Sequence, residues 1–253
     1  METIGMIAAM PQENKALLRR VRGWKRLALG TFHGYRFQRP GWDCVLVQSG
    51  IGLKRAMDAT RALLVTTNPQ FLICFGIAGA VNDDLQIGDV VVADHTCLLE
   101  KGVPGQFQPL ARLSDMAWRA AAQALQQRGA RLLSGTSITT RGSQADQLQV
   151  KDRTNPVLEM ETFGIAQVAA EKGIPLISLR SISDGPQSPI PFDLDGMMDK
   201  QYNFRIGKML AAVLRQPQIL LQSRQLIQNS GKAADHAAIA LLAAIDQPSP
   251  FAF

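Results

Sequence analysis

The chain alternates short, almost wholly apolar runs with longer amphipathic segments along most of its length. Runs such as QFLICFG (70–76) and PLISLRS (175–181) contain too few polar residues for a strand with one face in water. They therefore indicate strands buried on both faces, and the segments between them have the apolar spacing of covering helices. The alternation predicts an α/β fold, with a single domain built on a central mixed β-sheet surrounded by helices.

The same pattern predicts approximate boundaries. Strands are expected at residues 3–9, 43–48, 70–76, 87–94, 132–139, 156–160 and 175–181, with 27–38 as a hairpin partner of 43–48. Helices are expected at residues 11–22, 53–66, 114–128, 161–172, 196–214, 217–228 and 232–245. We expect a main domain over residues 1–215 and a C-terminal helical extension, residues 216–253, whose two amphipathic helices pack on it.

The charge is unevenly distributed along the 253 residues. The chain has 27 Lys and Arg against 21 Asp and Glu, a formal net charge of +6. Residues 1–40 hold eight basic side chains and two glutamates, which accounts for the whole surplus. A strongly basic protein often binds nucleic acid, but a surplus confined to one segment is typical of a solvated surface. No nucleic-acid partner is therefore expected.

Cysteine and histidine usage points to a cytoplasmic location and to a protein without a metal site. Cys44, Cys74 and Cys97 are widely spaced inside apolar stretches, which predicts buried, reduced thiols. No paired His or Cys spacing typical of a zinc site is present, so no metal is expected. No apolar run reaches the length of about 20 residues that a membrane-spanning helix needs.

Acidic and glycine residues follow several of the expected strands. Glu13 opens the first helix, Glu159 and Glu161 stand at a strand-to-helix junction, and Asp184 ends the strand that contains PLISLRS. The glycine segments SGIG and FGIAGA also follow or end strands, where glycine allows a ligand to approach the backbone. Because ligands of open α/β sheets bind at the carboxyl ends of strands, these residues predict a binding site there.

Taken in order, four motifs resemble one known family. IGMIAAMPQE, VLVQSGIG, FGIAGAVNDDLQIGDVVVAD and VLEMETFGIAQVAAEKGIPLISLRSISD resemble the purine nucleoside phosphorylase/nucleosidase superfamily, and most closely its methylthioadenosine/S-adenosylhomocysteine nucleosidase type. The resemblance covers about residues 3–210. It implies cleavage of the bond between ribose and a purine, a small-molecule nucleoside substrate and a homo-oligomer, a dimer or larger. The C-terminal helices are more loosely similar to the phosphorylase-like branch associated with hopanoid biosynthesis.

The resemblance also implies roles for individual residues. Asp184 is the expected general acid that protonates the leaving purine, and Glu13 is expected to activate the attacking water. Glu161 is expected to bind the ribose hydroxyls, with Met160 beneath the sugar. The remaining expected pocket residues are Glu159, Ile51, Ala78, Gly79, Ser183 and Phe192, with Arg180 supporting the neighbouring loops. An oxocarbenium-like transition state requires such an acid and nearby anionic groups.

Two departures from the family pattern bear on the reaction. Ile77 stands where phosphorylases carry a hydroxyl that helps to hold phosphate, and no Arg precedes FGIAG. The loss of both groups favours water as the nucleophile and a reaction without cofactor. Phosphate stays the alternative co-substrate because Arg55 is a possible substitute. Thr139 occupies the expected place of an aromatic side chain that stacks on the purine, which indicates a non-standard substrate.

Two further hypotheses follow from the basic segment. One is a non-catalytic nucleoside or nucleic-acid binder on the same scaffold. The other is an enzyme in peripheral contact with a membrane, through the basic residues and the apolar tail PSPFAF. The intact set of Glu13, Glu161 and Asp184 favours an enzyme, because a binding protein does not need an acid at position 184.

Overall fold

The computed structural model describes residues 1–100, 103–140, 153–186 and 218–252. The strands are β1 (Glu2–Ala8), β2 (Lys25–Leu29), β3 (Phe32–Arg39), β4 (Trp42–Gln48), β5 (Phe71–Ala80), β6 (Val90–Glu100), β7 (Val103–Pro104), β8 (Gln108–Pro109), β9 (Arg112–Leu113), β10 (Leu132–Thr140), β11 (Pro156–Glu159), β12 (Leu176–Asp184) and β13 (Phe251–Ala252). The helices are α1 (Pro11–Leu18), α2 (Leu53–Thr66), α3 (Asp115–Gln126), α4 (Thr162–Glu171) and α7 (Gln218–Ile245).

The main sheet is mixed, as the sequence predicts. Its strand order is β11-β10-β6-β12-β5-β1-β4-β3-β2. β1, β4, β5 and β12 run parallel to one another, and β6, β10 and β11 run in the opposite direction. β11 also pairs antiparallel with β5, so that part of the sheet closes into a ring of strands. The ring brings the end of β11 beside β5 and β12.

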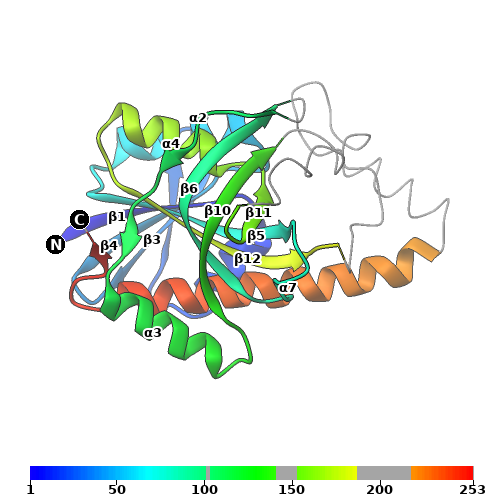
Figure 1. Ribbon diagram of the computed structural model, residues 1–253. Helices are drawn as coiled ribbons and strands as arrows, with labels where there is room; N and C mark the ends of the chain where they lie inside the picture. The colour runs from blue at the N-terminus through cyan, green and yellow to red at the C-terminus, as the bar shows by residue number, and fades with distance from the viewer. Residues whose placement is uncertain (101–102, 141–152, 187–217, 253) are drawn as a thin grey trace.

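Helices cover both faces of the sheet. The buried side chains of α2 and α4 form one apolar cluster with strands of the sheet, and those of α1, α3 and α7 form another. Figure 1 shows α2 and α4 on one side and α3 and α7 on the other. This burial on two faces explains the near-continuous apolar runs, because alternate side chains of β4, β5 and β12 enter different clusters. The predicted fold class is confirmed.

Several predicted boundaries are wrong. β6 runs over Val90–Glu100 where 87–94 is predicted, and α1 ends at Leu18 where residue 22 is predicted. Residues 217–228 and 232–245 do not form two helices, because α7 continues from Gln218 to Ile245. Gly231 causes no break: its backbone has no positive φ, and the cost of about 1 kcal/mol for a helical glycine is offset by the packing of the following turns. Residues 27–38 form two strands, separated at Gly30, whose φ of +60° makes the turn. The second of them, β3, pairs antiparallel with β4, which confirms the predicted hairpin. The helix expected at 196–214 lies outside the described residues.

The C-terminal tail packs into the protein. β13 pairs antiparallel with β9, and the Phe251 ring stacks on Phe71 with centroids 4.0 Å apart. Trp42 meets the same ring edge-on at 5.6 Å. Phe251 is therefore part of the main apolar cluster, and it is not available as a membrane anchor. In the part of the chain that the structure describes, no helix combines the length and apolarity needed to cross a bilayer.

Several basic side chains of residues 1–40 have acidic partners from outside that segment. Arg19 and Arg20 both contact Asp235 of α7, at 3.3 and 3.2 Å. Arg39 forms an ion pair with Asp246, and Arg36 forms one with Asp43. The tertiary structure therefore balances part of the basic surplus.

Candidate active site

Glu13 turns back from the start of α1 onto β5. Its Oε2 accepts a hydrogen bond from the Met10 amide at 2.8 Å, and its Oε1 accepts one from the Ile77 amide at 2.9 Å. The side chain is buried, and burial raises the pKa of its carboxyl group. A Cβ atom at Gly76 would lie 2.3 Å from Oε1. Glycine at position 76 is therefore what allows the carboxylate to reach the backbone of β5.

Arg180 of β12 lies at the centre of a buried acidic cluster. Its Nη2 donates to Oε2 of Glu159 at 2.7 Å, and its Nη1 lies 3.7 Å from Oε2 of Glu161. Nη2 also contacts Cys74 Sγ and Thr162 Oγ1, each at 2.9 Å. Although burial lowers the pKa of the guanidinium, these acidic neighbours raise it overall. Arg180 therefore carries the positive charge that opposes the buried carboxylates.

Glu159 directs its carboxylate into the protein. Oε2 accepts hydrogen bonds from Arg180, from the amides of Glu161 and Thr162 at 2.8 and 2.7 Å, and from the Thr162 hydroxyl. Oε1 accepts one from the Thr139 hydroxyl. Burial raises the pKa of Glu159, but Arg180 and these donors hold it below its usual value overall. Because the protein's own donors surround both oxygens, the geometry favours a positioning role over the predicted contact with a ligand.

Glu161 has far fewer partners, although it is only two residues further along the chain. Its Oε1 accepts the Gly52 amide at 2.9 Å, which ties the SGIG loop to the start of α4. Burial raises the pKa of its carboxyl group to about 7, and Arg180 only partly opposes this effect. Glu161 therefore keeps hydrogen-bonding capacity for a ligand near neutral pH.

Asp184 is the last residue of β12 and faces Gly79 of β5. A Cβ atom at Gly79 would lie 2.8 Å from Oδ2, so this glycine also makes room for a carboxylate. The Ser183 hydroxyl donates to Oδ1 at 2.6 Å. Burial raises the pKa of Asp184 more than this hydrogen bond lowers it, which is the direction that a general acid requires.

The structure brings most of the predicted residues to one region. Glu13, Glu159 and Glu161 surround Arg180, and Asp184 lies beyond them along β5 and β12. Ala78 and Ser183 are buried there, whereas Ile51, Gly79 and Met160 are half-buried. Phe192 lies outside the described residues.

Thr139 does not occupy a stacking position. Its side chain is fully buried, and its hydroxyl donates to Glu159 and accepts the Phe163 amide at 2.9 Å. The interpretation of Thr139 as a replaced purine-stacking residue is therefore wrong, because its side chain belongs to the network beneath the site. The sequence prediction includes Gly52 only as part of SGIG, without its contact to Glu161, and it misses Thr162. The position of Thr162, directly after Glu161 at the start of a helix, is the one signal that could have indicated it.

The chain matches the family model described as Phosphorylase superfamily over residues 3–215. A 5'-methylthioadenosine/S-adenosylhomocysteine nucleosidase from Tolumonas auensis is 32% identical over 207 residues, which is 75% of this chain and 90% of that protein. A nucleosidase of the same name from Haemophilus influenzae is 32% identical over 197 residues, which is 72% of this chain and 86% of that protein.

Solved structures have the same fold. The Neisseria meningitidis 5'-methylthioadenosine/S-adenosylhomocysteine nucleosidase, in complex with methylthio-immucillin-A, matches 97% of this chain and 99% of its own with a TM-score of 0.70 and 20% identity. Futalosine hydrolase of Helicobacter pylori matches 97% of both chains with a TM-score of 0.69 and 18% identity. With the family match covering residues 3–215, the chain belongs to the phosphorylase superfamily.

Proposed function

We propose that this protein cleaves the N-glycosidic bond of an adenosine-type nucleoside, with water as the nucleophile. The observation that carries the proposal is the set of three carboxyl groups of the buried Glu13 and Glu161 and the half-buried Asp184, whose pKa values are all raised by removal from water. Glycosidic cleavage requires an acid at the leaving group and anionic groups at the sugar. The two relatives named above are both nucleosidases, which supports the same reaction.

Asp184 is the proposed acid. Cleavage leaves electrons on the departing purine, and a proton delivered to the base as the bond breaks stabilises it as a leaving group. A carboxyl group whose pKa is raised by burial holds that proton closer to neutral pH than an exposed one does. In this role the Ser183 hydroxyl, at 2.6 Å, aligns Asp184 and stabilises the carboxylate that remains after transfer.

Glu13 and Glu161 are the proposed groups on the sugar side. Glu13 is held at both oxygens by backbone amides, so its carboxylate has a fixed orientation for receiving a proton from water. Glu161 is proposed to accept hydrogen bonds from the ribose hydroxyls. Arg180, which faces both carboxylates, limits their mutual repulsion.

Water is preferred to phosphate as the nucleophile because the residues near Glu13 offer little to hold an anion. The Ile77 side chain has no hydroxyl, and its amide already donates to Glu13. Arg55 is exposed and lies against Gly50, where a Cβ atom would be 2.8 Å from its Nη1. The reaction needs no cofactor, and phosphate enters only in the phosphorolytic alternative through Arg55.

We also propose a cytoplasmic homo-oligomer, a dimer or larger. The three cysteines are free and buried, which is consistent with a reducing compartment. The oligomer is an expectation from the family resemblance, and light scattering coupled to size-exclusion chromatography tests it. A mass equal to that of one chain would contradict it.

The decisive experiment compares wild-type protein with Asp184→Asn on 5'-methylthioadenosine, S-adenosylhomocysteine and adenosine, each with and without phosphate. Released adenine and the sugar product are measured by mass spectrometry. We expect the wild-type protein to release a sugar without phosphate at C1'. We expect the variant to lose about 10²–10⁴-fold in rate. The control Asp58→Asn changes an exposed carboxylate of α2 and should retain activity.

Each outcome has a distinct meaning. A ribose 1-phosphate product would establish the phosphorolytic alternative. Asp184→Asn with wild-type activity would remove Asp184 from the mechanism. Binding of nucleosides by wild-type protein without release of base would favour the non-catalytic binder.

A further inference from the structure

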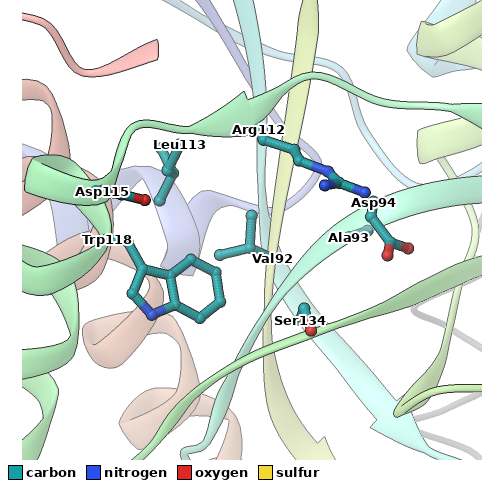
Figure 2. A pocket seen from close by; sticks show the side chains of 8 residues that line it. All are labelled: Val92, Ala93, Asp94, Arg112, Leu113, Asp115, Trp118 and Ser134. Atoms are coloured by element: carbon teal, nitrogen blue, oxygen red, sulfur yellow. The ribbon is translucent and has the colours of Figure 1, made fainter. Parts of the chain in front are cut away.

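A cavity lies against the helix α3 and differs in its lining residues from the proposed active site. Its volume is about 220 Å³, and Figure 2 shows the side chains that line it, from β6, β9, α3 and β10. None of the residues assigned above to nucleoside cleavage lines this cavity. A volume below the range of about 300–1,000 Å³ typical of drug-sized ligands indicates a smaller molecule.

One end of the cavity is polar and carries both signs of charge. Figure 2 shows the Arg112 guanidinium and the Asp94 carboxylate at this end, with the Ser134 hydroxyl nearby. The side chain of Arg112 makes no hydrogen bond or ion pair within the described part of the chain. Asp94 has His95 as its partner, with Nδ1 of His95 3.0 Å from Oδ1. The second carboxylate oxygen of Asp94 and the guanidinium therefore remain available to a ligand.

The other end is mainly apolar. The Trp118 indole forms one wall, and Val92 and Leu113 contribute buried aliphatic side chains. Asp115 lies at this end, in the first turn of α3, where a carboxylate stabilises the helix dipole. An aliphatic group that enters here leaves water and contacts the indole face and two aliphatic side chains. Its transfer is favourable in proportion to the apolar area that it buries.

The charges restrict what can occupy the cavity. A simple anion would meet Arg112 but also two carboxylates, Asp94 and Asp115, and a simple cation would lie beside the positive charge of Arg112. A molecule with a carboxylate and an ammonium group on the same carbon satisfies Arg112 and Asp94 together. We propose that this cavity binds a small zwitterionic amino acid with an aliphatic side chain, with its charged groups at Arg112 and Asp94 and its side chain against Trp118.

The cavity is built on well-supported elements. β9, which carries Arg112 and Leu113, pairs with β13 at the C-terminal tail. The Ser114 hydroxyl caps α3 by accepting the Ala117 amide and donates to the Ser249 carbonyl oxygen. Val92 and Ser134 are neighbours in the register of β6 and β10. The lining side chains therefore come from elements joined by backbone hydrogen bonds, and a bound ligand need not order them.

Isothermal titration calorimetry of the full chain with L-leucine tests the proposal. We expect saturable binding with a Kd of about 1 mM or lower. Three probes separate the contributions: 3-methylbutylamine lacks the carboxylate, 4-methylpentanoate lacks the ammonium group, and glycine lacks the side chain. Each should bind at least about tenfold more weakly than leucine, because each leaves one part of the cavity unmatched.

Arg112→Gln is the matched variant and should weaken leucine binding at least about tenfold. Arg119→Gln removes an exposed arginine of α3 that does not line the cavity, and this control should bind leucine as wild type does. Absence of saturable binding up to about 10 mM, or equal affinity in Arg112→Gln, would overturn the proposal. Binding of 4-methylpentanoate as tight as that of leucine would overturn it in favour of a simple anion site. The measurement contains no nucleoside, so its result is independent of the proposed catalytic function.

Discussion

The guanidinium of Arg180 donates a hydrogen bond to Oε2 of Glu159 at 2.7 Å, and the side chain of each residue is 1% exposed. This ion pair joins β12, which ends at Asp184, to the end of β11, two residues before Glu161. A charged pair this deeply buried is stable only because further donors satisfy the carboxylate. The amides of Glu161 and Thr162 and two threonine hydroxyls supply them.

Removing the charge of Glu159 should destabilise the fold. Glu159→Gln leaves Arg180 without its closest counter-charge, and breaking a buried pair costs about 3–5 kcal/mol. Urea unfolding at pH 7 should show a loss of about 3 kcal/mol. Asp58→Asn, which breaks an exposed pair with Lys54, should cost less than about 1 kcal/mol. Equal stability of Glu159→Gln and wild type would show that the pair contributes no net stability.

Gly76→Ala should reduce activity through Glu13. The new Cβ would lie 2.3 Å from the carboxylate, so Glu13 must move, and a displacement of about 1 Å can cost about 100-fold in rate. Steady-state kinetics on the nucleoside of the proposed panel that wild-type protein cleaves measure the effect. Gly231→Ala is the control, since a Cβ there meets no atom within 4 Å, and it should raise stability by about 0.4–1 kcal/mol at unchanged activity. Wild-type activity of Gly76→Ala would exclude a role for the position of Glu13.

Glu161 should make stability depend on pH. Burial raises the pKa of its carboxyl group from 4.5 to about 7, so the folded state binds this proton more tightly than the unfolded state. The resulting stability is complete below pH 4.5 and is lost as the pH rises to about 7. The difference between these two pKa values corresponds to about 3 kcal/mol in the free energy of unfolding.

Urea unfolding of wild-type protein and Glu161→Gln at pH 5 and pH 8 tests this dependence. Between pH 5 and pH 8, the free energy of unfolding should fall by about 2–3 kcal/mol more in the wild-type protein than in the variant. Glutamine cannot ionise, so the variant lacks this contribution while retaining an acceptor for the Gly52 amide. Parallel pH profiles for the two proteins would contradict the raised pKa.

The C-terminal tail should contribute to global stability. Phe251→Ala removes a ring that packs on Phe71 and Trp42, and a buried phenylalanine truncation costs about 3–5 kcal/mol. Thermal and urea unfolding should both show the loss. Ile227→Ala on α7, where the isoleucine is 72% exposed, should change stability by less than about 0.5 kcal/mol. A tail that contributes nothing would give the two variants equal stability.

The alternation of apolar and amphipathic segments was sufficient to predict most of the fold. Residues 53–66 were expected to be helical and form α2, because their apolar spacing and their helix boundaries are local properties. The C-terminal helices were divided wrongly at Gly231, because glycine opposes a helix only weakly and the packing of α7 outweighs it. The domain boundary at residue 215 stays a prediction, although α7 shares an apolar cluster with the sheet.

The fold class, the placement of acidic residues at strand ends and the family follow from the amino-acid sequence alone. These depend on residue type and spacing along the chain, which the sequence contains directly. The contrast between Glu159, whose charge Arg180 neutralises, and Glu161, two residues away, whose pKa stays raised, arises only in the folded protein. The reason is that hydrogen bonding and burial at each carboxylate depend on β5, β10 and β12, which meet only when the ring of strands closes.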